Sequence, residues 1–113
     1  MVVCIESGDN YQISGVTSDG SSQVSVLLPA KPTAAGTYSV IQWGETISAG
    51  QAQVLAMDGR VQMSPIQYWS TGGGQISVTM VGGKPKVNFT NVPVEHSIDG
   101  TPQTVSGSFK CTM

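Results

Sequence analysis

Charge is scarce in this chain. Charged residues make up 11% of its 113 residues, less than half of the roughly 25% that is typical of soluble proteins. Glu, Lys, Arg and Leu, which build helix faces, are correspondingly few. Uncharged polar residues and valine take their place: 14 Ser, 10 Thr, 9 Gln and 14 Val. Because Val and Thr suit pleated, half-buried surfaces, this composition predicts an all-β protein.

Several classes of function lack their sequence signals. The five basic residues form no long run and the net charge is −2, so the clustered Lys and Arg typical of a nucleic-acid-binding surface are missing. No apolar stretch approaches the roughly 20 residues of a membrane-spanning helix. We therefore expect neither a nucleic-acid partner nor a membrane span.

Catalytic and metal-binding patterns are equally sparse. His96 is the only histidine, and most carboxylates lie in expected turns, where Asp side chains bond to nearby backbone. There is no calcium-loop motif and no Gly-x-Ser-x-Gly elbow around a serine. We expect no catalytic residue, no metal site and no cofactor, and we interpret the protein as a non-enzyme.

The only two cysteines, Cys4 and Cys111, lie at opposite ends of the chain. In a small Ser/Thr/Gly-rich domain, such a pair indicates a disulfide made in an oxidising compartment. Closing so long a loop removes about 4–5 kcal/mol of unfolded-chain entropy in the simple model. Cys111 shares one face of a period-2 segment with Phe109, which marks that face as buried. The alternative is a pair of unrelated buried thiols.

The compartment follows from the disulfide. Residues 1–6 contain no basic region followed by an apolar run, so they do not form a signal peptide. If the disulfide forms, we expect the sequence to be the mature form of an exported protein that is periplasmic, displayed on the outer surface or secreted.

Turn signals recur at short spacing between alternating segments, and no segment shows helical spacing beyond a turn. The pairs Asp19-Gly20, Asp58-Gly59, Gly82-Gly83 and Asp99-Gly100 suit tight hairpin loops. Residues 37–43 form a further expected strand. The pattern predicts a single domain over residues 1–113, with about eight strands in a disulfide-closed antiparallel β-sandwich or, alternatively, a small β-barrel. Three prolines, Pro65, Pro85 and Pro93, should mark edges, bulges or strand starts.

Three aromatic residues, Trp43, Tyr68 and Trp69, lie at expected strand ends beside Gly-rich loops. Such rings either form a platform for sugars or peptides, or plug the ends of a sandwich. Because Tyr68 and Trp69 are consecutive, a strand would point them to opposite faces. One of the two should therefore face outward.

Two motifs carry a family resemblance. The segment over residues 26–40, in which a strand ends in Pro-containing residues and restarts at Gly36-Thr37-Tyr38, is similar to a pattern in small secreted or lipoprotein β-domains of Gram-negative bacteria. The closing Val105-Ser106-Gly107-Ser108-Phe109 resembles their last strand. The resemblance implies an exported β-domain, often an antigen, and assigns no functional residue. Cys4 is not preceded by a lipobox.

Together these observations predict an exported surface or periplasmic interaction or structural domain, with carbohydrate binding through outward aromatics as the alternative. The strand carrying Gln75, Ser77 and Thr79 should face the strand carrying Lys86 and Asn88, giving a flat polar face that a protein partner could cover. A surface glycan would instead stack on an aromatic ring. The oligomeric state and the ligand are left open.

Overall fold

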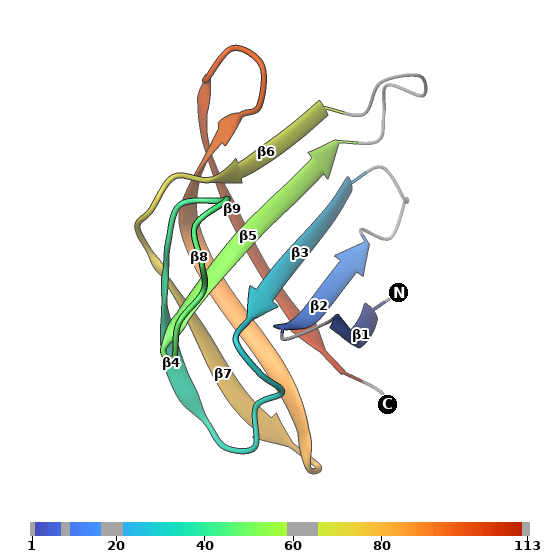
Figure 1. Ribbon diagram of the computed structural model, residues 1–113. Helices are drawn as coiled ribbons and strands as arrows, with labels where there is room; N and C mark the ends of the chain where they lie inside the picture. The colour runs from blue at the N-terminus through green and yellow to red at the C-terminus, as the bar shows by residue number, and fades with distance from the viewer. Residues whose placement is uncertain (1, 8–9, 17–21, 59–65, 112–113) are drawn as a thin grey trace.

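The computed structural model describes residues 2–7, 10–16, 22–58 and 66–111. Most of these residues lie in nine β-strands, and none lies in a helix (Figure 1). The predicted all-β class is therefore confirmed. The strands are β1 (Val2–Ser7), β2 (Asn10–Val16), β3 (Ser22–Leu28), β4 (Gly36–Val40), β5 (Gln51–Asp58), β6 (Ile66–Ser70), β7 (Gln75–Val81), β8 (Lys84–His96) and β9 (Pro102–Lys110).

The nine strands pair into one continuous sheet. Its order is β1-β2-β3-β5-β4-β7-β8-β6, with β9 on β8 and an additional pairing between β5 and β6. Every pairing is antiparallel except that of β4 with β5. The pairings from β5 through β4, β7, β8 and β6 return to β5 and form a ring, from which β1–β3 and β9 extend. The sheet is thus neither two separate sheets nor a simple barrel.

The sheet bends on itself into two layers. In Figure 1, β2, β3, β5 and β6 lie side by side, and β8 and β9 cross behind them. We call β1, β2, β3, β5 and β6 the first layer, and β4, β7, β8 and β9 the second layer. This division separates the two outward surfaces described below.

Alternate residues of both layers point into a shared apolar core. Fully buried members include Ile13 and Val54 from the first layer and Ile76 and Val87 from the second. The layers approach closely where Gly15 of β2 meets Phe109 of β9, because a Cβ built on Gly15 would collide with the phenyl ring. Glycine at this position therefore lets the last strand pack directly on the second.

The Gly82-Gly83 prediction is confirmed: both residues have positive φ angles, 61° and 80°, and join β7 to β8, as a tight hairpin turn requires. Gly100, with φ 73°, lies in the loop between β8 and β9. The turn predicted at Asp19-Gly20, the glycine of the turn predicted at Asp58-Gly59, and Pro65 lie outside the described residues.

The long strand β8 contains an irregularity between Phe89 and Val92 in its pairing with β9. Asn91 has a φ of 52° there, which Asn tolerates better than most residues, and its backbone N–H donates to Ser106 Oγ at 2.9 Å. Pro85 lies at the start of β8 and Pro93 directly after the irregularity. Both prolines thus occupy the predicted kinds of position.

The strand expected over residues 37–43 is shorter than predicted, because β4 ends at Val40. The chain keeps isolated backbone bonds beyond that point, from Ile41 N to Ala52 O at 2.8 Å and from Trp43 N to Ser70 O at 2.9 Å. It then turns, with Glu45 N donating to Gln42 O. The segment after Val40 therefore leaves the sheet and folds over its outer side.

Candidate interaction surfaces

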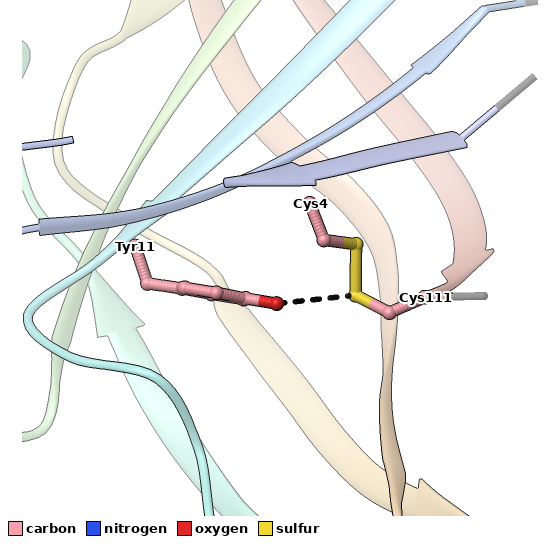
Figure 2. Close-up of a disulfide and its surroundings, with 3 residues drawn as sticks. All are labelled: Cys4, Tyr11 and Cys111. Carbon is pink, nitrogen blue, oxygen red and sulfur yellow. Dashed lines mark hydrogen bonds between the residues drawn. A yellow bond between two sulfur atoms is a disulfide. The ribbon is translucent and has the colours of Figure 1, made fainter. Parts of the chain in front are cut away.

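The predicted disulfide is present and joins Cys4 of β1 to Cys111, directly after β9 (Figure 2). The S–S distance is 2.03 Å and the two Cα atoms are 5.9 Å apart. Among the described strands, β1 pairs only with β2 and β9 only with β8. The covalent bond therefore links the two edges of the sheet that hydrogen bonds leave separate.

Tyr11 lies against this disulfide. Its hydroxyl is 3.7 Å from Cys111 Sγ (Figure 2), and because a disulfide sulfur carries no proton, the phenol is the donor. Burial raises the pKa of Tyr11, and the Glu6 carboxylate raises it further. The phenol thus keeps its proton, and its ability to donate, over a wider pH range. Cys111 itself is fully buried, with 0% of its surface exposed.

His96, the single histidine, is engaged in the loop between β8 and β9. Its Nδ1 accepts the backbone N–H groups of Ile98 and Asp99 at 3.1 and 3.2 Å. Its ring also packs edge-to-face on Tyr68, with 5.3 Å between centroids. Asp99 Oδ1 lies 3.3 Å from the same nitrogen, so the carboxylate stands beside the imidazole ring. His96 therefore organises a turn.

Asp99 completes the same loop. Its Oδ1 accepts the hydroxyl of Thr101 at 2.7 Å and the Thr101 backbone N–H at 2.9 Å. These bonds, the hydroxyl bond foremost, lower the pKa of the Asp99 carboxyl, with a smaller contribution from His96. The side chain thus acts as the turn-forming Asp that the sequence predicted.

The three aromatic candidates do not act as one platform. Tyr68 lies opposite Ala56 and packs against the core, whereas Trp69 lies opposite Leu55, one position out of phase. The two consecutive rings therefore face opposite sides, as predicted, and Trp69 is the outward one. Trp43 follows β4 in the segment that folds over the sheet.

The outer side of the first layer carries apolar side chains that sequence analysis did not single out. Its members are Val3 and Ile5 of β1, Leu27 of β3, Leu55 and Met57 of β5, and Trp69 of β6. We call this set the apolar outer face. Val3 and Ile5 are 39% and 45% exposed, and the other four are half-buried. The signal was present in the sequence, because the segments 22–28 and 51–58 carry apolar residues in both strand phases.

Two hydrogen-bonded serines occupy the centre of this face. Ser14 and Ser25 lie directly opposite each other, and their hydroxyls are 2.9 Å apart. The Gln12 side chain donates to Ser14 Oγ at 2.8 Å and lies 3.4 Å from Ser25 Oγ. Both serines are buried although they point away from the core. Register places Val3 on one side of the pair and Leu55 on the other.

One end of the apolar outer face is already covered. Gln53 of β5 is buried, and its side-chain amide donates to the backbone carbonyls of Gln42 and Glu45 at 3.0 and 2.6 Å. These bonds hold the segment after β4 against the sheet. The part nearer β1 has no such cover among the described residues.

The outer side of the second layer is polar, as the sequence predicted, except for the exposed Val81 at the end of β7. Ser77 lies opposite Asn88 and Thr79 opposite Lys86. A shallow hollow of about 640 Å³ opens on this side, lined by Thr37, Gly74, Gln75, Ser77, Asn88, Phe89 and Thr90. The two layers thus present chemically different outward surfaces.

Comparisons with known proteins identify no relative. No protein-family model matches the chain, and neither the curated proteins nor the solved structures contain a match. Within the described residues, no group of three or more His, Cys, Asp or Glu side chains is placed to hold a metal ion. No helix in that part of the chain is long and apolar enough to cross a membrane.

Proposed function

We propose that this protein is an exported, non-catalytic interaction domain that assembles with a second copy of itself through β1 and the apolar outer face. Export is supported by the disulfide between Cys4 and Cys111, a bond that persists in oxidising compartments. A structural role is supported by His96, because its Nδ1 accepts hydrogen bonds from two backbone N–H groups of its own turn.

The observation that carries the proposal is that the first layer, besides its core residues, turns six large apolar side chains outward, among polar neighbours such as Gln12, Ser14 and Ser25. A sheet that packs on one core normally alternates between apolar and polar positions, with the polar side in water. Here Leu27 of β3 and Leu55 and Met57 of β5 point away from the core. Trp69 of β6 lies directly opposite Leu55 on the same side. Contiguous apolar side chains on an outer surface mark a contact site.

Exposure points to β1 as the place of contact. Val3 and Ile5, on the edge strand, are more exposed than the other four members of the apolar outer face, on β3, β5 and β6. An edge strand presents backbone N–H and C=O groups that another strand can pair with. An added strand would extend the apolar face and cover its two most exposed members.

The sequence of β1 suits pairing with itself. If two copies align antiparallel about Cys4, Val3 lies opposite Ile5 of the second copy on the outer side. Glu6 then lies opposite Val2 of the second copy, so no two carboxylates meet. Cross-strand apolar pairs stabilise a sheet, whereas like charges directly opposite destabilise it. A two-fold arrangement of this kind is the commonest form of oligomer.

Sedimentation velocity over a wide range of protein concentration tests the proposal. We expect a concentration-dependent dimer, and we expect Ile5→Lys to weaken it by about tenfold or more, since burying such a side chain contributes about 1.5–3 kcal/mol. Ile98→Lys is the matched control, because Ile98 is 89% exposed in the loop between β8 and β9. A protein that stays monomeric, or that dimerises equally well with Ile5→Lys, contradicts the proposal.

A second candidate is glycan binding at Trp69. It is supported by the outward phase of this ring on β6, because an exposed indole can stack on a sugar. Tyr68 does not contribute to such a site, since it packs against the core and His96. This candidate therefore depends on a single ring, and we rank it below self-assembly.

A further inference from the structure

The second layer concentrates positive charge on its outer side. Lys84 and Lys86 of β8 alternate with buried Pro85 and Val87 and thus share the outward face with Lys110 of β9. These are three of the five basic residues in a chain of net charge −2. Strands β4, β7 and β9 contain no Asp or Glu, and β8 carries its single acid, Glu95, beyond the irregularity at Phe89. Within the described strands of the second layer, the outer side before this irregularity therefore carries lysines and no Asp or Glu.

Two of these lysines oppose each other. Lys86 and Lys110 are direct cross-strand partners, and like charges in that position destabilise a sheet. No ion pair engages either side chain among the described residues. An anion placed between the two ammonium groups would turn this repulsion into attraction.

The hollow on the same face adds neutral hydrogen-bonding groups. Ser77 and Asn88, which line it, lie two residues along their strands from Thr79 and Lys86, a separation of about 7 Å. Ser108 donates its hydroxyl to Asn88 Oδ1 at 2.8 Å, which fixes the amide and leaves its NH₂ group to donate outward. Hydroxyls and an amide thus lie about one sugar ring away from the lysine pair.

We propose that this face binds an acidic oligosaccharide, with ring hydroxyls in the hollow and a carboxylate or sulfate between Lys86 and Lys110. The charge pattern requires an anion, and the lining of hydroxyls and amides suits a polyhydroxylated one. A single-stranded nucleic acid would stack its bases on exposed aromatic rings, and the outward positions of β4, β7 and β9 carry none. An acidic sugar held by the lysine pair differs from the neutral glycan considered at Trp69, because charge and not ring stacking supplies its affinity. This site lies on the outer side of the opposite layer from the proposed dimer contact.

Calorimetric titration of the oxidised protein with an oligogalacturonate, and with the same oligomer after methyl esterification, tests the proposal. We expect saturable binding of the acid, little binding of the ester, and loss of affinity as salt screens the charges. The double variant Lys86→Gln/Lys110→Gln should bind about tenfold more weakly. Lys31→Gln/Lys84→Gln, a variant that removes the same charge and keeps the opposing pair, should lose less.

Further variants and probes separate the outcomes. Ser77→Tyr fills the hollow while keeping every lysine, and it should abolish binding if the sugar rings enter there. Unchanged affinity in Ser77→Tyr or in the Lys86/Lys110 double variant would overturn the proposal. Equal binding of the methyl ester would also overturn it, as would tighter binding to phosphatidylglycerol vesicles than to the oligosaccharide, because an anionic membrane would then be the partner.

Discussion

Removing the disulfide should cost this domain a large part of its stability. The informative change is Cys4→Ala/Cys111→Ala, because alanine at the fully buried position 111 introduces no unsatisfied hydroxyl, as serine would. Tyr11 loses its sulfur partner, but its ring can remain packed against the core. The change in the free energy of unfolding of this variant therefore reports mainly the loss of the disulfide.

The expected magnitude follows from the length of the closed loop. The cysteines are separated by 107 residues, for which the chain-entropy relation gives about 4.8 kcal/mol at 25 °C. A small domain has about 5–15 kcal/mol in total, so the variant should be marginally stable. With an unfolding entropy of about 2.1 cal/mol/K per residue, the same loss corresponds to a decrease in Tm of about 20 °C.

Urea unfolding followed by tryptophan fluorescence measures this loss, with wild type under reducing conditions as the control that keeps both sulfur atoms. Reduced wild type and the double variant should agree within about 1 kcal/mol, since both lack the constraint on the unfolded chain. Equal stability of oxidised and reduced protein would refute the reasoning. Alkylation of two thiols in unreduced native protein, seen by intact mass, would refute the disulfide and remove the main support for export.

Three further changes have defined outcomes. Gly15→Ala should destabilise the fold by about 1–3 kcal/mol in urea unfolding, and adding Phe109→Leu should recover part of that loss, because the new Cβ meets the Phe109 ring. The pKa of Asp99 is lowered from its usual value of 3.8. The Asp99 carboxylate therefore stabilises the fold at pH values above 3.8, and this stabilisation is lost as the pH falls through the folded-state pKa. Thr101→Val should raise that pKa in an NMR titration, because the hydroxyl bond is lost. Neutral oligosaccharides should leave tryptophan fluorescence unchanged, and a saturable response that Trp69→Ala removes would promote glycan binding at that ring.

Local signals in the sequence predicted local features well. Strand phase alone placed Cys111 on the buried side with Phe109, and the structure confirms that placement and the disulfide. The hairpin at Gly82-Gly83 was equally predictable, since two consecutive residues with positive φ are a requirement of the turn itself. The hairpin depends on a few neighbouring residues, and the disulfide was predictable because the chain contains only two cysteines.

The order of the strands was not predictable in the same way. Turn signals connect strands that follow each other in the chain, but β3 pairs with β5, and β4 pairs with β5 in parallel. The approach of β9 to Gly15 of β2 likewise joins residues far apart in sequence. These arrangements depend on the loop-closure entropy and on how the whole apolar set packs, which one strand's pattern does not encode.

The apolar outer face was missed for a different reason. Val24, Val26 and Leu28 alternate cleanly and account for the core, whereas Leu27 lies in the other strand phase. Leu55 has the same relation to the core residue Val54. A strand with apolar residues in both phases is usually covered on both sides. By this rule, the apolar residues in both phases of β3 and β5 indicate a second contact surface.

The disulfide and the proposed contact surface meet in one strand. β1 has six residues and pairs only with β2 among the described strands, and a short edge strand held by one neighbour is a weak element. Cys4 fixes the middle of β1 to the end of β9, while Val3 and Ile5, on either side of it, point outward. The bond therefore holds rigid the very residues that self-assembly would use, and it lowers the entropy lost when a second β1 strand pairs with them. If the domain assembles through β1 as proposed, the disulfide would do more than stabilise the fold, because oxidation would also prepare this edge for assembly.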